Sequence, residues 1–449
     1  MERIKLGEKL GYALGDTAAN IAWRTLSTFL LVFYTDVFGI SAAAAGTLLL
    51  ITRVTDGVTD VMMGMIADRT NTSKGKFRPW VLWTAFPLGI VLALTFTTPD
   101  FGPTGKLIYA YITYFALTLV YTASNVPYSA LMGVMTSDER ERTSLSSFRF
   151  AGAYFGGILT QGLLIYLVLF LGNGDENLGY QYSIYLLSGV LVLFLLVTYF
   201  TTKERVKPAK KEKKEVIWDD LGDLIKNKPW VILLVVGFLF VTYNSIKQGI
   251  TVIYFKRFVD HETLAASYMI VLLVVSMIAA LITTPLSNKL GKKNLFIYVM
   301  LFSGVTNSLL FLAGPDDLTL IFILGALSEF GAGIMPVLFF AMLGDSADYS
   351  EWKNGRRATG LVFSAGTFAM KFGGGAAGAI TGFVLSGYGY DGMDESTIAG
   401  AIPGIKMLMS WVPALITIPA VIVLVIYPLS NVRLEGIAND LATRRSTNN

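Results

Sequence analysis

The stretch TKERVKPAKKEKKEVIWDDLGDLIKNKP, residues 202–229, divides this chain into two long apolar parts and carries nine Lys or Arg residues. A helix that spans a bilayer needs about 20 mostly apolar residues. Runs of that kind occur at 11–38, 42–67, 79–98, 107–134, 146–172, 181–201, 229–257, 263–286, 295–313, 318–345, 358–386 and 401–429. Because they are continuous rather than alternating, they favour helices over a β-barrel. The sequence predicts an all-α membrane protein of twelve transmembrane helices in two six-helix halves.

Composition agrees with a membrane protein and excludes several kinds of site. The chain has 449 residues, of which 53% are hydrophobic and 15% charged, whereas soluble domains carry about 25% charged residues. It has no cysteine and one histidine, His261, which rules out disulfides and argues against a histidine metal centre. It also lacks a GxxxxGK[ST] phosphate loop and a serine elbow. We therefore expect no enzyme, no cofactor and no nucleic-acid partner.

Basic residues predict the orientation. With the N-terminus in the cytoplasm, the predicted cytoplasmic segments hold 27 of the 36 Lys and Arg residues, and the outer loops hold three. We expect both termini in the cytoplasm of a multi-pass protein of the cell (inner) membrane. The expected parts are a six-helix bundle at 1–201, a cytoplasmic linker at 202–228, a second bundle at 229–430 and a cytoplasmic tail at 431–449. Within the linker, 216–225 forms either a solvated charged segment or a short amphipathic helix on the membrane surface.

Charged residues inside the predicted spans are candidates for function, because charge at membrane depth costs about 2.5–3.5 kcal/mol on insertion scales. The acids are Asp16, Asp56, Asp60 and Glu329, and the bases are Arg24, Arg53, Arg149, Lys247, Lys371 and Lys406. Asp56 and Asp60 lie one helical turn apart on one face. They form either a site for a coupling cation or part of a set of ion pairs that fixes helix packing. Glu329 is expected to pair with a base across a helix interface, and Asp16 to act at a gate.

Amides, cations and an aromatic ring suggest a solute site. Asn20, Trp23 and Arg24 follow one another on the first span, and Asn125 and Lys371 sit in the middle of later spans. Such groups can hydrogen-bond hydroxyls or a carboxylate, and an indole can stack on a sugar ring. Because the bases outnumber the acids, we expect a preference for an acidic saccharide such as a uronide, with Arg24 as its carboxylate contact. The alternative is that Arg24 pairs with Asp16 or Glu329.

Four segments carry a family resemblance. They are FYTDVFG (33–39), TRVTDGVTDVMMGMIADRTNTSKGKFRPW (52–80), NVPYSALMGVMTSDERERTSLSSFR (125–149) and DYSEWKNGRRATG (348–360). These segments resemble the glycoside-pentoside-hexuronide:cation symporters of the major facilitator superfamily, and the arrangement of two six-helix halves is typical of that superfamily. In this superfamily Gly64 and Asp68 belong to a loop motif, in which the glycine is expected to allow close approach of helices.

The resemblance implies a secondary symporter that moves a sugar or glycoside inward with a cation by alternating access. Eukaryotic lysolipid carriers resemble the same family, so a transporter of lysolipids or other amphiphiles is the alternative. The residue patterns described above and this resemblance together give the expected site residues. They are Asp56, Asp60, Thr59 and Thr122 for the cation (with Asp56 and Asp60 as metal ligands if it is Na+), Asn20, Trp23, Arg24, Asn125, Arg149, Thr367 and Lys371 for the substrate, and Asp68, Asp345, Asp348, Glu351 and Arg357 for gating.

This chain also departs from the family's best-known member. Asn20 and Asn125 stand where that member has sugar-binding aspartates, and Thr59 stands where it has an asparagine in its sodium site. The coupling cation is therefore left open between H+ and Na+. We expect the partners to be a small saccharide, this cation and the lipid bilayer, and the transporter to be a monomer.

Overall fold

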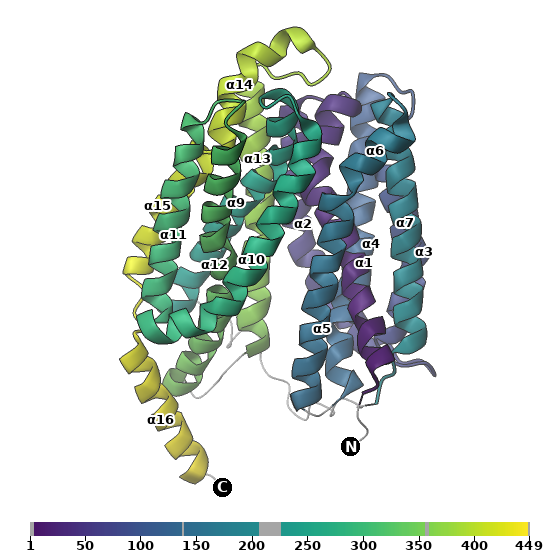
Figure 1. The fold of residues 1–449 in the computed structure, drawn as a ribbon. Coiled ribbons are helices and arrows are strands. Elements are labelled where there is room, and N and C mark those ends of the chain that lie inside the picture. Colours follow the sequence, from purple (N-terminus) through teal and green to yellow (C-terminus); the bar gives the residue numbers. More distant parts are fainter. Residues whose placement is uncertain (1–3, 137–138, 206–225, 355–358, 448–449) are drawn as a thin grey trace. The chain divides into compact units, whose positions relative to one another are not determined.

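The computed structural model describes residues 4–136, 139–205, 226–354 and 359–447, which are almost entirely helical (Figure 1). Up to residue 205 the helices are α1 (Leu6–Val32), η1 (Phe33–Val37), α2 (Ala42–Arg69), α3 (Arg78–Thr95), α4 (Pro103–Met135), α5 (Glu139–Gly157), η2 (Ile158–Gly162), α6 (Leu164–Gly172) and α7 (Glu176–Thr201). From residue 226 they are α9 (Lys228–Arg257), α10 (Glu262–Leu290), α11 (Lys292–Leu309), η3 (Leu310–Leu312), α12 (Leu318–Asn354), α13 (Thr359–Gly387), α14 (Glu395–Met409), α15 (Trp411–Val425) and α16 (Asn431–Thr447). The predicted all-α class is confirmed for the described residues, which contain no named strand and a single β-bridge, between Thr72 and Gly75.

Ten helical segments in the described ranges are long and apolar enough to cross a membrane. The helices α1 and α2, with 27 and 28 residues, are not among them. At 1.5 Å per residue each helix is about 40 Å long, so their length does not explain why they are not among the ten segments. Both carry charged side chains along their middle turns, among them Asp16 and Arg24 in α1 and Asp56 and Asp60 in α2. These two long helices hold six of the eleven residues predicted to bind the cation or the substrate.

Two predicted spans are interrupted in their middle, whereas η1 and η3 lie at the ends of two others. The span expected at 146–172 switches from α5 to the π-helix η2 and then to α6, and the span expected at 401–429 breaks into α14 and α15 around Ser410. The tail expected after residue 430 forms the helix α16, whose Ile437 and Leu441 are buried and whose Asp440 accepts a hydrogen bond from the Trp352 indole of α12 at 2.9 Å. The segment 216–225, expected as a linker or a surface helix, lies outside the described residues.

The chain divides into two compact units. The first contains Met1–Lys210 together with Gly249–Ile270 and Thr381–Ile402, which are the end of α9, the start of α10, and the segment from the end of α13 into α14. The second contains Lys211–Gln248, Val271–Ile380 and Pro403–Asn449. The proposed bounds of the two bundles remain a prediction.

In the first unit, α1 packs closely against α5 because glycines face it. A Cβ at Gly156 would lie 2.7 Å from the backbone oxygen of Thr17 and 2.8 Å from Cβ of Asn20, and one at Gly152 would collide with the carbonyl of Ala13. Small residues of this kind let membrane helices approach backbone to backbone. The α1–α5 contact therefore depends on the absence of side chains at these two positions.

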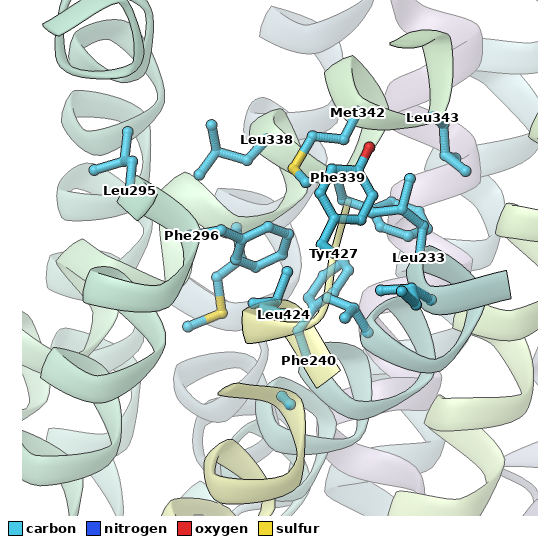
Figure 2. Close-up of a cluster of buried hydrophobic side chains, with 14 of the residues drawn as sticks. Leu233, Phe240, Leu295, Phe296, Leu338, Phe339, Met342, Leu343, Leu424 and Tyr427 are labelled. Carbon is cyan, nitrogen blue, oxygen red and sulfur yellow. The ribbon is translucent and has the colours of Figure 1, made fainter. Parts of the chain in front are cut away.

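The second unit has an aromatic core (Figure 2). Phe240 of α9 lies 5.3 Å from Phe339 of α12 and 6.3 Å from Phe296 of α11, measured between ring centroids. Leu424 and Tyr427, at the end of α15 and just after it, are buried in the same cluster. Helices that are distant in sequence are thereby held together by this core.

The structure corrects one expectation about glycines and confirms another. Gly64 was expected to allow close approach of helices, but no described atom lies within 4 Å of the position of a Cβ there. That prediction is wrong in this structure, since the neighbouring Met62, Met65 and Ile66 are also exposed. The glycines after Lys371 do permit close packing, because a Cβ at Gly373 would collide with the carbonyl of Phe238 on α9.

We expect Gly156→Ala to destabilise the protein, because the added methyl group would meet the backbone of α1. Overpacking of a tight contact costs about 1–3 kcal/mol. Gly64→Ala is the matched control, since it makes the same change in a helix with open space around it and gains up to about 1 kcal/mol from helix propensity. The measurement is the melting temperature in detergent. Equal melting temperatures for the two variants would show that α1 and α5 are not packed as described.

Candidate functional site

The residues expected to bind the cation lie on α2 and α4 of the first unit. The Thr122 hydroxyl donates a hydrogen bond to the Asp60 carboxylate, with 2.9 Å between Oγ1 and Oδ1. Asp56 is buried, and the Thr59 hydroxyl donates to the backbone carbonyl of Asp56 at 3.1 Å. The structure thus brings Thr122 to Asp60 and directs Thr59 to the main chain. The side chain of Arg53 lies outside the described part.

The oxygen atoms in this region suit a proton or a hard cation. No group of three or more His, Cys, Asp or Glu residues that could hold a metal ion occurs among the described residues. A cation here would instead be held by the carboxylates of Asp56 and Asp60 with hydroxyl or carbonyl oxygens nearby, which are the ligands that hard cations prefer. The assignment of this region as a cation site remains a prediction.

Asp16 is the centre of a polar cluster between α1, α4 and α5. Its carboxylate accepts a hydrogen bond from Nε of Arg149 at 2.9 Å, and the Asn20 amide donates to its backbone oxygen at 2.9 Å and to Oδ2 at 3.4 Å. Arg149 also donates to Oγ of Ser129 at 3.1 Å. Two residues expected to bind substrate, Asn20 and Arg149, therefore converge on one carboxylate. Asn125, on α4, is half-buried and makes no hydrogen bond with a described residue.

Trp23 and Arg24 lie half-buried on α1. The Trp23 ring is 5.9 Å from the ring of Tyr121 on α4. Nη1 of Arg24 donates to Oε1 of Gln161 at 3.1 Å. Gln161 was not predicted as a site residue, although it is an isolated amide in the otherwise apolar run that follows Thr160.

The second unit holds a buried ion pair. Lys247 of α9 donates from Nζ to Oγ of Ser328 at 2.9 Å and lies 3.5 Å from Oε2 of Glu329 on α12. The Ser276 hydroxyl of α10 donates to the same carboxylate at 2.6 Å. The expected pairing of Glu329 with a base across a helix interface is confirmed. Lys247, one of the bases whose excess was taken to favour an acidic saccharide, therefore has an acidic partner within the protein.

The other predicted residues of the second unit lie on α12 and α13. Thr367 is exposed and donates to the backbone oxygen of Phe363 at 3.0 Å, and Lys371 is half-buried one turn further along. Asp345, expected at a gate, accepts from Nζ of Lys292 at 2.7 and 2.8 Å. Asp348 and Glu351 follow on the same helix and also make interactions. The side chain of Asp68 and the whole of Arg357 lie outside the described residues, so the gating roles remain a prediction.

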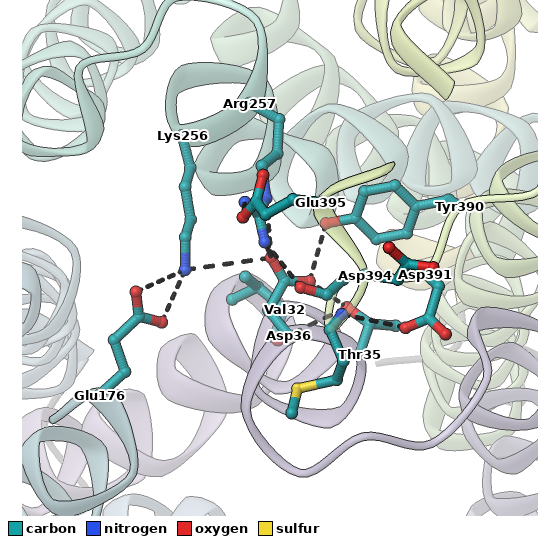
Figure 3. A network of polar contacts seen from close by, with 12 residues as sticks. Val32, Thr35, Asp36, Glu176, Lys256, Arg257, Tyr390, Asp391, Asp394 and Glu395 are labelled. Carbon is teal, nitrogen blue, oxygen red and sulfur yellow. Dashed lines mark hydrogen bonds and ion pairs between the residues drawn. The ribbon is translucent and has the colours of Figure 1, made fainter. Parts of the chain in front are cut away.

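Figure 3 shows a cluster of charges in the first unit that the sequence did not predict. Asp36 of η1 accepts from Arg257 of α9 at 3.0 Å and from the Tyr390 hydroxyl at 2.7 Å, and its side chain is fully buried. Arg257 also donates to Glu395 at 2.6 Å, and Lys256 binds Glu176 of α7 at 2.6 Å. Segments from both halves of the sequence are thereby joined within one compact unit.

Burial, followed by the neighbouring Asp36 carboxylate, raises the pKa of Tyr390 well above its ordinary value. The phenol, which donates to Asp36, thus stays protonated to a higher pH than an ordinary tyrosine would. The sequence offered a weak sign of this cluster: Lys256 and Arg257 form the only basic pair in the predicted outer loops. It did not indicate which acid they would meet.

Comparison with known proteins identifies the family. A family model described as "MFS/sugar transport protein" matches residues 11–431. The chain belongs to this family. Together with the ten apolar helical segments, this makes it a multi-pass membrane protein.

Relatives match over nearly their whole lengths. The chain is 37% identical to the "Putative glycoside/cation symporter YagG" of Escherichia coli (strain K12), over 99% of this chain and 97% of the relative. It is 33% identical to the isoprimeverose transporter of Lactiplantibacillus pentosus, over 98% of this chain and 92% of the relative. Among solved structures, a bacterial homologue of the human lysosomal transporter Spinster, in an inward-facing and unoccupied conformation, superposes with a TM-score of 0.71. That structure covers 93% of this chain and 95% of its own at 13% identity, so it shows the fold alone.

We expect Asp60→Asn to abolish uphill substrate uptake without unfolding the protein, because the carboxylate that Thr122 contacts would lose its charge. Accumulation in energised proteoliposomes should fall at least about tenfold, the effect of losing one charge-assisted contact. Asp100→Asn, the same change in an exposed loop, is the control. Accumulation at the parent level in Asp60→Asn would place the coupling site elsewhere.

Asp36→Asn should destabilise the protein strongly, because it leaves the guanidinium of Arg257, whose side chain is 10% exposed, with a weaker partner. Removing one member of a buried ion pair costs about 3–5 kcal/mol. Glu395→Gln removes the other carboxylate that binds Arg257, but the Glu395 side chain is 80% exposed, and exposed pairs contribute about 1 kcal/mol or less. Melting temperatures in detergent compare the two variants, and a larger loss for Glu395→Gln would contradict the burial of Asp36.

Proposed function

We propose that this protein is a secondary symporter that moves a sugar or glycoside into the cell together with H+ or Na+ by alternating access. In this proposal twelve helices cross the membrane, both termini are cytoplasmic, and the protein catalyses no covalent reaction. Membership of a sugar-transport family supports the substrate class. The observation that carries the cation coupling is the contact between Asp60 and Thr122 beside the buried carboxylate of Asp56.

Two carboxylates one turn apart favour the binding of a cation. Their mutual repulsion falls when a proton or Na+ lies between them, and the cost of charge at membrane depth falls with it. The relative named as a glycoside/cation symporter supports the same coupling in this chain. Thr59 directs its hydroxyl to the main chain, and the choice between H+ and Na+ is decided by experiment.

The substrate would meet a polar strip on α1. Asn20, Trp23 and Arg24 offer an amide, an aromatic face and a guanidinium within two turns of one helix. Arg149 approaches the same strip through Asp16. Amides and guanidinium groups bind sugar hydroxyls, and the flat face of an indole packs against the apolar face of a pyranose.

The charge of the substrate is the finer part of the proposal. Two of the bases have acidic partners within the protein, because Arg149 pairs with Asp16 and Lys247 with Glu329. Asp16 and Glu329 thus form their ion pairs with these bases, and Arg24 donates a hydrogen bond to the Gln161 amide. A carboxylate on the sugar would give Arg24 a charged, bidentate partner.

We expect the purified protein in proteoliposomes to show counterflow of at least one glycoside. The panel contains a neutral pentoside, a neutral hexoside, the matching uronide and a lysolipid, which is tested both as a substrate and as a competitor. If Na+ is the coupling ion, substrate affinity should rise with Na+ at fixed pH, since the two sites are thermodynamically linked. If H+ is the coupling ion, affinity should change between pH 6 and 8 and be insensitive to Na+.

The proposal fails if no glycoside exchanges while the lysolipid does, since that result would favour an amphiphile transporter. The double variant Asp56→Asn/Asp60→Asn is the negative control for coupling. It should still exchange substrate down a gradient but should not accumulate it.

A further inference from the structure

The π-helix η2 brings one buried amide to α1. Gly152 and Gly156 allow α5 to lie against the backbone of α1, and the helix then widens into a π-turn at Ile158–Gly162. A π-turn inserts a residue into the helical register and often marks a functional site. Here it leaves Gln161 only 3% exposed and in contact with two side chains of α1.

Both polar ends of Gln161 have a partner. Its Oε1 accepts from Nη1 of Arg24 at 3.1 Å, and its Nε2 donates to Oγ1 of Thr28 at 3.0 Å. A guanidinium has donors only, so the oxygen end of the amide must face Arg24 and the NH2 end must face Thr28. Arg24 thus sets the direction of the amide, and the buried Thr28 hydroxyl accepts from its NH2 end and satisfies it.

The contact between Gln161 and Arg24 differs in its chemistry from the contact that Arg149 makes near the same face of α1. Arg149 is held by the Asp16 carboxylate, which opposes its charge. Gln161 instead holds Arg24 through a neutral acceptor, which orients the guanidinium without cancelling a unit of charge. A glutamate at 161 would have nearly the same shape but would form an ion pair with Arg24.

We propose that Gln161 is a positioning residue that aims the guanidinium of Arg24 at an anionic group of the transported sugar. This inference rests on the proposed function, because it requires that Arg24 meets the substrate. Thr28 completes the set by accepting from the NH2 end of the amide. Specificity for substrate charge is then set by a residue that does not itself touch the sugar.

The test measures KM and Vmax for a hexoside and the matching uronide in proteoliposomes. The variants are Gln161→Glu, Gln161→Met, Arg24→Gln and Arg24→Gln/Gln161→Glu. Gln181→Glu, the same change on α7 where the amide contacts Tyr185, is the control for an added charge. The melting temperature of each variant checks its folding.

Gln161→Glu is expected to raise KM for the uronide about tenfold or more, the usual effect of losing a charge-assisted hydrogen bond. KM for the hexoside and Vmax for both sugars should stay within about twofold of the values for the parent protein. In the Arg24→Gln background the same change should have no further effect on the ratio of the two KM values. Gln161→Met, which removes the acceptor without adding charge, should shift the ratio in the same direction and keeps the test decisive if the glutamate variant does not fold.

Three results would overturn the inference and leave the proposed function standing. The first is a parent that takes up the hexoside but not the uronide. The second is a parallel rise of both KM values in Gln161→Glu, which would indicate a structural role. The third is an unchanged effect of Gln161→Glu in the Arg24→Gln background. If neither sugar is taken up, and no other member of the glycoside panel is either, the proposed function itself is overturned.

Discussion

A charge inside a bilayer must find a partner within the protein, and this constraint organises both units of the chain. In the first unit Asp16 binds Arg149, and in the second Glu329 binds Lys247. Each pair joins helices that are distant in sequence and is completed by neutral donors or acceptors such as Asn20 and Ser276. Pairs of this kind fix which helix faces meet, because a rotated helix would leave a charge in lipid without a partner.

Close packing and helix irregularity provide the remaining geometry. Gly152 and Gly156 bring α5 against α1, and the π-turn that follows directs Gln161 back toward the same helix. A regular α-helix would place this amide about one residue out of register, on a different face. The contact with Arg24 therefore depends on two features, the glycines and the π-turn, that act one after the other along a single span.

The sequence predicted most elements of the fold and fewer of the contacts. Apolar runs placed the helices well because length and hydropathy are local properties. They failed to predict the break around Ser410 and the π-turn at Ile158–Gly162, which depend on neighbouring helices. The charged residues of α1 and α2 were recognised from their cost in a bilayer. Their partners were mostly not, because no local pattern fixes which turn of α5 faces Asp16 or which loop reaches Asp36.

The side chain that a buried carboxylate contacts indicates whether the carboxylate has a fixed structural role or can bind and release a cation. An arginine or lysine can only donate, so it stabilises a carboxylate in its charged form and opposes its protonation. A hydroxyl can both donate and accept, so Thr122 can stay hydrogen-bonded to Asp60 whether that carboxylate is ionised, protonated or bound to a cation. Asp16, held by Arg149, lacks this freedom. A site that must bind and release a cation in every cycle is better served by the hydroxyl than by the guanidinium, which supports the proposal of a coupling site on α2 and α4 rather than at the ion pair of α1 and α5.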